Sequence, residues 1–314
     1  MVAESTDQLY RTHARRFERW LKDHKRRADP EGYCAALDAL TKSVSRKTWR
    51  LYRNALTYRI RISKGPELAA QFMALTDQLE KPPTRRRKLL RHVPTDVAKA
   101  ILEALRRARA KTAHAVADLM MSIIATGIRP AEWPSVEVPR VGVLRVRNAK
   151  FKPASGSVPG RGNGQYRELQ IEVEFIGTVI EEAILRTIAR YRGRKWSSVA
   201  PNVNRTFKGT LRGLIRREAL TRRWEKLRLY DCRHQFSCDA KATLSLLGGE
   251  VAAAMGHGSA LTAVEHYGRR GKAGGRSAVR PSAASVAAVD PASIVRLRLE
   301  LGVGTEGSPT PAPA

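Results

Sequence analysis

The sequence predicts a mainly α-helical protein, with a small helical N-terminal domain followed by a mixed, mostly α domain that holds a small antiparallel β-sheet. Apolar residues recur at helical spacing through most of the chain up to Gly268. Residues 168–174 instead alternate between apolar and charged or polar side chains, which is typical of a half-buried strand. A length of 314 residues suits two domains and a tail.

Residues 1–80 are predicted to form the helical N-terminal domain, with four helices. Their apolar stripes are Tyr10, Ala14, Phe17 and Leu21; the segment from Tyr33 to Leu40; Trp49, Tyr52, Leu56 and Ile60; and Leu68, Phe72, Leu75 and Leu79. Ser45 is a suitable N-cap for the third helix. The other faces of that helix are covered by basic side chains, which gives the domain a cationic surface.

Residues 81–93 are predicted to be a basic linker. The run KPPTRRRK from Lys81 to Lys88 contains two prolines, which stop a helix. Arg85, Arg86 and Arg87 follow in succession, and such a segment could lie along a phosphate backbone.

Residues 94–270 are predicted to form the second domain. Thr95 is expected to cap its first helix, and a second helix runs through the apolar residues between Val116 and Ile124. Gly127 permits a C-terminal turn, Pro130 can begin a new helix, and Arg129 lies between them.

Two strands are expected next in this domain. One strand contains Val141, Val143, Leu144 and Val146, and its antiparallel partner contains Leu169, Ile171 and Val173. Lys150, Lys152 and the glycine-rich segment ASGSVPGRGNG lie between the strands, and two further helices run from Ile180 to Tyr191 and from Phe207 to Ile215.

Residues 271–314 are rich in Gly, Ala, Ser, Arg and Pro and are predicted to be a flexible tail. A short helix near residues 291–301 is the exception, because Asp290 and Pro291 form a cap and first-turn pair and Ile294 and Leu297 share one face. We expect this helix to dock on its own domain or on a neighbouring subunit, and it is a candidate for contact between subunits.

The charge of the chain indicates a polyanionic partner. Lys and Arg number 58 against 29 Asp and Glu, a formal net charge of +29. Nucleic acid fits better than a membrane surface, because the basic residues are spread over several segments. The predicted DNA contacts are Arg46, Lys47, Arg50, Arg53, Arg85, Arg86 and Arg87.

The three cysteines, Cys34, Cys232 and Cys238, show no CxxC spacing, which favours a reducing compartment. No signal peptide and no apolar run long enough to span a bilayer are visible. We therefore expect a cytoplasmic protein that associates with the nucleoid.

The stretch from Leu229 to Arg270 contains the residue types with the clearest chemical meaning. It brings Arg233, His257 and Tyr267 within a few short helices. A phenol can attack phosphorus while a cation and an imidazole hold the oxygens that gain charge. The stretch therefore predicts chemistry on a phosphate.

Four motifs occur in an order that resembles the tyrosine recombinase (phage integrase) family. They are TGIRPAEW, a lysine on a β-hairpin, YDCRHQF and GHGSALTAVEHYGRR. The resemblance extends over roughly Pro94 to Arg270, and the N-terminal domain resembles the core-binding domain of that family. It implies the tyrosine recombinase catalytic fold for the second domain.

The resemblance implies the following catalytic residues: Arg129, Lys150 with Lys152 as the alternative, Tyr230, Arg233, His257 and the nucleophile Tyr267. Glu132 occupies the acidic position that is usually buried, and Tyr230 replaces the usual histidine. The family also implies double-stranded DNA as partner, a homo-tetramer on DNA, possible accessory DNA-bending proteins, and neither cofactor nor metal. The expected function is site-specific recombination, integrating or excising a mobile genetic element.

Other interpretations of these residues remain open. Singly, Arg129 could cap a helix, Arg233 could pair with Asp231, and Tyr267 could be a core aromatic. A zinc site from His257 and His266 is disfavoured by their spacing. A type IB topoisomerase would use similar residues, and a disabled recombinase would bind DNA without cutting it.

Overall fold

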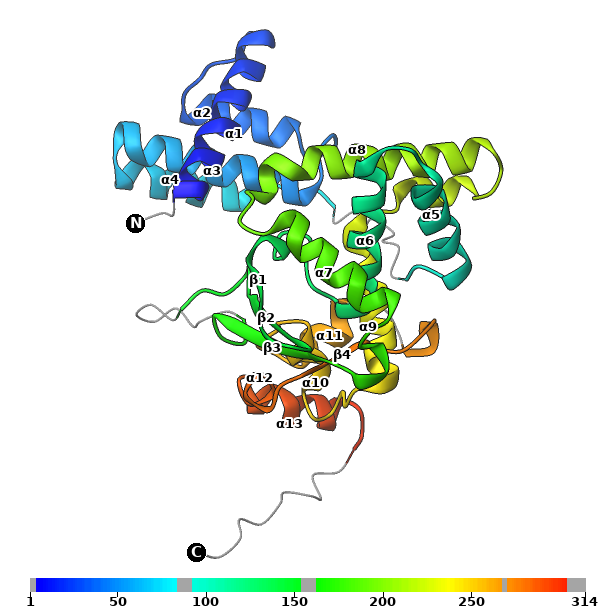
Figure 1. Ribbon diagram of the computed structural model, residues 1–314. Coiled ribbons are helices and arrows are strands. Elements are labelled where there is room, and N and C mark those ends of the chain that lie inside the picture. The colour runs from blue at the N-terminus through cyan, green and yellow to red at the C-terminus, as the bar shows by residue number, and fades with distance from the viewer. Residues whose placement is uncertain (1–3, 84–91, 154–161, 267–269, 304–314) are drawn as a thin grey trace, which may run out of the picture. The chain divides into compact units, whose positions relative to one another are not determined.

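The computed structural model describes residues 4–83, 92–153, 162–266 and 270–303. The chain forms two compact units, Met1–Lys88 and Leu89–Ala314. Both are mainly helical, and the second contains one small antiparallel sheet (Figure 1), which confirms the predicted fold class. Within the described ranges, no helix has both the length and the apolar character needed to cross a bilayer.

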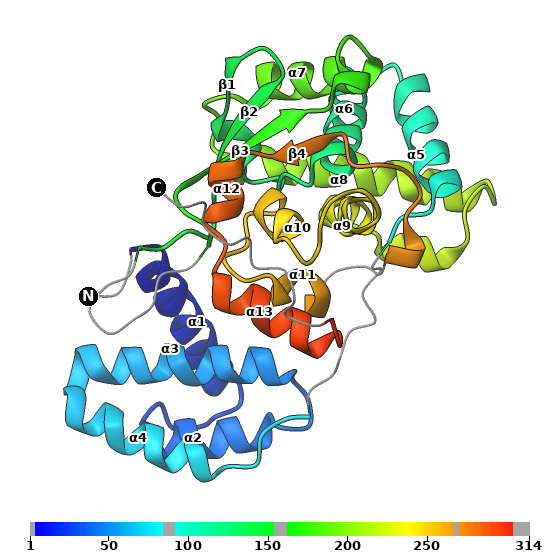
Figure 2. The same cartoon turned by 90° about the horizontal axis from the view of Figure 1, so that it is seen from below.

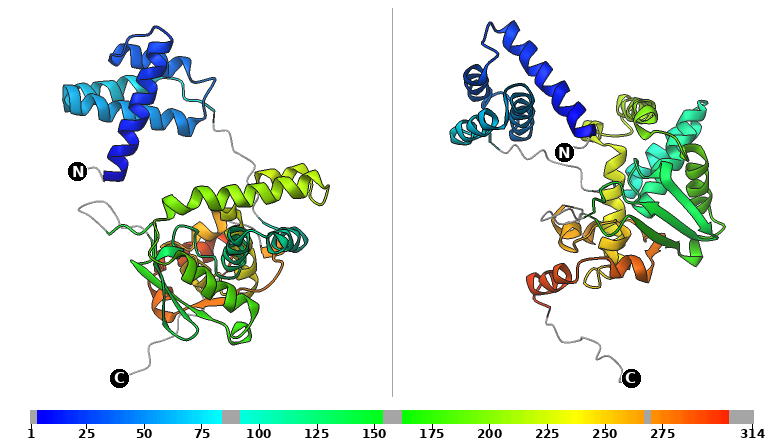
Figure 3. Two further views of the ribbon diagram at one scale, coloured as in Figure 1. Left: turned by 45° about the horizontal axis from the view of Figure 1, so that its top comes forward. Right: turned by 90° about the vertical axis from the view of Figure 1, so that its left-hand side faces the viewer.

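The first unit consists of α1 (Glu4–Asp23), α2 (Pro30–Ala39), α3 (Arg46–Lys64) and α4 (Pro66–Gln78), which Figure 3 shows from two sides. Ser45 caps α3 as expected, because its hydroxyl accepts a hydrogen bond from Thr48 N at 3.2 Å. Most residues of the predicted apolar stripes form the core, and its bulkiest buried members are Phe17, Tyr33, Trp49 and Phe72. Leu75 is an exception, because it is 51% exposed.

The second unit is built around α6. Its long helices are α5 (Thr95–Arg107), α6 (Lys111–Thr126), α7 (Val179–Tyr191), α8 (Trp196–Arg216) and α9 (Cys232–Thr243). Because α6 packs against the other four, most of its residues are buried. One detail of the prediction is wrong: Thr95 is the first residue of α5 and not its cap, and Pro94 precedes it without a side-chain bond.

The sheet is antiparallel in the order β1 (Val136–Arg140), β2 (Val143–Arg147), β3 (Tyr166–Ile171) and β4 (Val279–Pro281), as Figure 2 shows. Two strand predictions extend too far. Val141 lies in the turn before Gly142 and is 85% exposed, and Val173 is in a 3-10 turn and is 82% exposed. β1 was not predicted, because only Val136 of its five residues is buried and the strand signal is correspondingly weak.

The prediction of a flexible tail for residues 271–314 is wrong for part of this segment. Residues 279–281 form β4, in which Val279 pairs with Ile171 of β3. The composition gave no sign of this strand because its partner lies more than a hundred residues earlier. α12 (Ala283–Ala287) follows, and then α13 (Pro291–Glu300) at the predicted place, with Asp290 accepting hydrogen bonds from Ala292 N and Ser293 N.

The helix α13 docks on its own domain. Its residue Leu297 is buried in a small cluster with Ala252 and Ala253 of α10 (Glu250–Ala254) and with Ala260. The backbone N–H of Ala260, just before α11 (Leu261–His266), donates to the hydroxyl of Ser293 at 3.0 Å. This face of α13 is therefore used within the chain.

Candidate active site

Arg129 is held at the end of α6 by a glycine-dependent turn. Gly127 adopts a left-handed conformation with φ of +67°, and its N–H donates to Ile123 O at 2.9 Å. A Cβ atom at Gly127 would overlap the ring of Phe236, so the position also needs glycine for space. The turn leads the chain inward, and Arg129 is 5% exposed.

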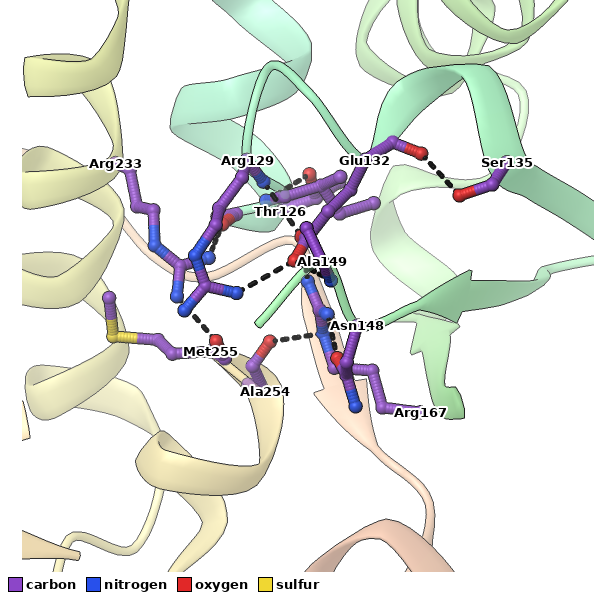
Figure 4. Close-up of polar contacts among 12 residues, drawn as sticks. Thr126, Arg129, Glu132, Ser135, Asn148, Ala149, Arg167, Arg233, Ala254 and Met255 are labelled. Carbon is purple, nitrogen blue, oxygen red and sulfur yellow. Dashed lines mark hydrogen bonds and ion pairs between the residues drawn. The ribbon is translucent and has the colours of Figure 1, made fainter. Parts of the chain in front are cut away.

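Glu132 is the carboxylate at the centre of the site. It accepts hydrogen bonds from Arg129 Nη1 at 2.7 Å, from Arg129 N at 3.0 Å and from Ala149 N at 3.2 Å. Arg167 Nη2 donates at 2.8 Å to Oε2, the oxygen that also accepts from Arg129 N (Figure 4). Burial by itself raises the pKa of Glu132, but the three nearby guanidinium groups of Arg167, Arg129 and Arg233 hold that pKa well below its ordinary value. The carboxylate is therefore ionised.

Arg233 lies on the first turn of α9 and is fully buried. Its guanidinium donates to the backbone oxygen of Met255 (Figure 4) and to that of Gly127. Its Nη2 atom lies 3.3 Å from His257 Nε2. These contacts join the end of α6 to the turn after α10. The neighbouring carboxylate of Asp231 accepts from Arg228 Nη2 at 2.6 Å.

His257 lies in the turn after α10 and is buried. Burial first, and then the positive charges of Arg233, Arg129, Arg167 and Lys150, hold the pKa of His257 well below its ordinary value. A guanidinium can only donate, so the contact with Arg233 makes Nε2 of His257 the acceptor. The imidazole is accordingly neutral at neutral pH, with its proton on Nδ1.

Lys150 and Tyr230 lie at the edge of this cluster. Lys150 is exposed in the turn that follows β2, and its charge acts on His257. Tyr230 is half-buried, and its ring packs edge-on against His234 at a centroid distance of 6.1 Å. Tyr230 also lines a cavity of about 410 Å³ together with Arg129 and Phe207.

Tyr267 lies outside the described residues, as do Arg85, Arg86 and Arg87. The helix α11 ends at His266, so the structure describes the chain up to the residue before the predicted nucleophile.

No protein-family model matches the sequence, and no curated protein matches it. A crystal structure of a lambda integrase dimer bound to a COC′ core site aligns with 77% of this chain at 15% identity and a TM-score of 0.50. The chain spans 65% of the length of that integrase. A crystal structure of XerA recombinase aligns with 93% of this chain and 98% of its own, at 14% identity and a TM-score of 0.36, so the fold assignment rests on the integrase.

The chain has the fold of a tyrosine recombinase. Within this tyrosine recombinase fold, the structure brings together Arg129, Arg233 and His257, which the sequence places in three separate motifs. Three guanidinium groups and a neutral imidazole around one carboxylate form a site suited to an oxyanion. In the described ranges, no three His, Cys, Asp or Glu side chains gather so as to hold a metal ion.

The structure places one of the predicted DNA contacts differently from the others on α3. Arg46, Lys47 and Arg50 are exposed on α3, but the side chain of Arg53 is only 11% exposed. Its guanidinium donates to Thr76 Oγ1 at 2.8 Å and pairs with Asp77 at 2.7 Å. Arg53 therefore joins α3 to α4, because the acceptors that α4 presents take up its donors.

Sequence reasoning missed Arg167 and Asn148. Arg167 lies on β3, two residues before Leu169 and four before Ile171, so all three point to the buried side of the sheet. An arginine at an inward position of an alternating strand is unusual, because charged residues are rarely buried without a partner. That alternation was the signal available in the sequence.

Proposed function

We propose that the protein is a site-specific DNA recombinase that cuts and rejoins DNA through a 3′-phosphotyrosyl intermediate. The observation that carries the proposal is the buried cluster of Arg129, Arg233 and His257 in a fold shared with a lambda integrase. Its guanidinium groups outnumber its carboxylates, so the site is prepared for an anion such as a scissile phosphate.

The proposed reaction begins with Tyr267, whose phenolic oxygen attacks phosphorus while the bond from phosphorus to the 5′ oxygen breaks. Arg129 and Arg233 each hold a non-bridging oxygen, whose charge grows in the five-coordinate transition state. The products are a tyrosine esterified to the 3′ phosphate and a free 5′ hydroxyl. Attack by a different 5′ hydroxyl reverses the step and joins new strands without an external energy source.

Protons must move in this reaction, because the phenol loses one and the departing 5′ oxygen gains one. Lys150 is the proposed acid for the 5′ oxygen, since it is exposed and close enough to act on His257. Lys152 is the alternative. His257 donates a hydrogen bond from its Nδ1–H group to the phosphate, and Tyr230 contributes a phenolic hydroxyl where the family has an imidazole. The proton of the Tyr267 phenol passes to water.

The partner and the setting follow from the same proposal. Double-stranded DNA is bound by a core-binding domain, residues 1–80, and by a catalytic domain, residues 94–270, which the basic linker 81–93 joins. The exposed residues Arg46, Lys47 and Arg50 contact phosphates of that DNA. A homo-tetramer in the cytoplasm, joined to the nucleoid, integrates or excises a mobile element, with DNA-bending proteins as possible accessories.

The test is covalent trapping on DNA. The protein is incubated with a nicked suicide duplex, from which the 5′ fragment diffuses away, and the peptide linked to DNA is mapped. The proposal expects a link at Tyr267 and none in Tyr267→Phe. A link at another tyrosine would show that this other residue, and not Tyr267, is the nucleophile. If the folded protein binds DNA but forms no link, it is a disabled DNA-binding protein.

A type IB topoisomerase is the second candidate, since it would form the same linkage. Supercoiled plasmid distinguishes the two functions. Relaxation by a monomer without exchange of strands between two DNA molecules would favour the topoisomerase, whereas exchanged products at one sequence favour the recombinase.

A further inference from the structure

Arg167 is a completely buried charged group beside the candidate site that the proposed reaction does not use. Its side chain is 0% exposed. It donates from Nη2 to Glu132 at 2.8 Å, from Nε to Ala254 O at 3.0 Å and from Nη1 to Asn148 Oδ1 (Figure 4). Removing a guanidinium from water costs several kcal/mol, by general estimate, unless its donors are satisfied. An apolar residue would fill this inward position of β3 at a lower cost.

The three acceptors of Arg167 belong to three segments, and each segment carries a residue of the proposed reaction. Glu132 holds the guanidinium of Arg129. Asn148 is two residues before Lys150. Ala254 precedes Met255, whose oxygen accepts from Arg233, and the turn continues to His257. Arg167 therefore connects all the proposed phosphate ligands that the structure describes.

The net charge of the cluster also favours the binding of an anion. Glu132 is the carboxylate that Arg129 and Arg167 share, and Arg233 acts on it as a third cation. The four side chains carry two positive charges in excess of neutrality. Arg167 also donates to Glu132, so the negative charge of this carboxylate is already partly balanced. Glu132 therefore neutralises only part of the charge of Arg129, and Arg129 still attracts an incoming anion.

The turn before His257 is shaped around the same arginine. Gly256 has φ of +65°. A Cβ atom there would lie 2.5 Å from Asn148 Oδ1 and 2.8 Å from Arg167 Nη1. The backbone that carries His257 thus passes so close to Arg167 and Asn148 that only glycine fits.

We propose that Arg167 is a positioning residue, which sets the orientation of Arg129 and joins the segments that carry Arg129, Lys150 and His257 into one phosphate-binding site. This inference rests on the proposed DNA-cleaving function. Arg167 does not contact the reacting atoms. It acts through Glu132, Asn148 and the backbone of Ala254.

The experiment compares two scissile linkages in a nicked suicide duplex: a normal phosphate, and a methylphosphonate, which has no negative charge. The proteins are the full chain as wild type, Arg167→Met and Arg167→Lys. Arg145→Met is the matched control, because Arg145 is an exposed arginine of the neighbouring strand β2 that stacks on Tyr166. Circular dichroism and thermal unfolding show which proteins are folded.

Arg167→Met is expected to slow covalent trapping on the phosphate by about 100-fold, the effect of removing one preorganised donor. On the methylphosphonate its deficit shrinks to less than about tenfold, because no charge remains there for Arg129 to hold. Arg167→Lys regains part of the rate, since it restores the charge but not the three-way contact. The control reacts like the wild type on both linkages.

An equal deficit on both linkages, or no deficit, overturns the inference while wild-type trapping leaves the proposed function standing. If Arg167→Met does not fold, the deficits of Arg167→Lys on the two linkages are compared instead. Equal deficits of that variant overturn the inference in the same way. If the wild type traps neither linkage, the proposed function is overturned and this inference with it.

Discussion

At the scale of single residues, Glu132 is the position on which the buried charges depend. It is the acceptor for both Arg129 and Arg167, and its side chain is fully buried. We expect Glu132→Gln to lower the free energy of unfolding by about 3 kcal/mol or more, because two buried guanidinium groups lose their counter-charge. Urea unfolding measures this change. Glu137→Gln on the exposed part of β1 is the control, and equal effects of the two substitutions would contradict the expectation.

His257 makes stability depend on pH. Its folded-state pKa is lowered, by burial first and then by the surrounding cations, from the ordinary value of 6.5. The unfolded chain therefore binds a proton more readily, and the stability contributed by a neutral His257 is fully present above pH 6.5 and is lost as the pH falls below it.

We expect His257→Gln to reduce the slope of unfolding free energy against pH between pH 6.5 and more acidic values. The measurement is urea unfolding at a series of pH values. His114→Gln, at an exposed histidine, is the control. An unchanged slope in His257→Gln would show that the fold does not lower the pKa of this imidazole.

Tyr230 tests the assignment of the motif that contains Arg233. We expect Tyr230→His to trap DNA as well as the wild type or faster, because an imidazole can exchange protons near neutral pH and a phenol does so poorly. The rate of covalent trapping on the nicked duplex is the measurement. A folded variant without activity would mean that Tyr230 does not occupy the position of the missing histidine.

At the scale of elements, α13 packs against the segment that leads to the proposed nucleophile and stabilises it. Leu297 is buried against α10, and the hydroxyl of Ser293 holds the start of α11, which ends one residue before Tyr267. The oxygen of Gly258, next to His257, accepts from Asp290 N at 2.9 Å. The C-terminal helix thereby supports two motifs of the site from within the chain.

Leu297→Ala is expected to lower the free energy of unfolding by about 2–5 kcal/mol, the range for a buried leucine that leaves a cavity. Leu299→Ala on the same helix is the matched control, because Leu299 is 64% exposed. Urea unfolding compares them. If both cost the same, α13 does not dock on α10 and α11 in solution.

At the scale of the whole molecule, the net charge of +29 favours binding to the proposed partner, duplex DNA. We expect affinity for a DNA duplex to fall steeply with salt, since each phosphate contact releases a counterion. Replacing Arg46, Lys47 and Arg50 together by alanine should reduce the slope of log affinity against log salt by about 3. Fluorescence anisotropy at several salt concentrations measures the slope. If the slope does not change, α3 does not contact the phosphates.

The sequence by itself determined the features that depend on neighbouring residues. Helical periodicity located the long helices, and Asp290 with Pro291 located α13. The motifs around Arg129, Arg233 and His257 identified three side chains that the fold brings together, because each motif carries its own turn or helix start.

Only the tertiary structure decided the features that depend on distant partners. β4 forms because β3 offers its free edge, and α13 docks because α10 and Ala260 present a small apolar surface. Arg53 and Arg50 lie on the same helix, yet the acceptors on α4 bind Arg53 and leave Arg50 exposed. The burial of Arg167 depends on Glu132 and Asn148, which lie 35 and 19 residues away in the chain. Local patterns report on backbone geometry, whereas the energy of a buried charge depends on which groups the fold places around it.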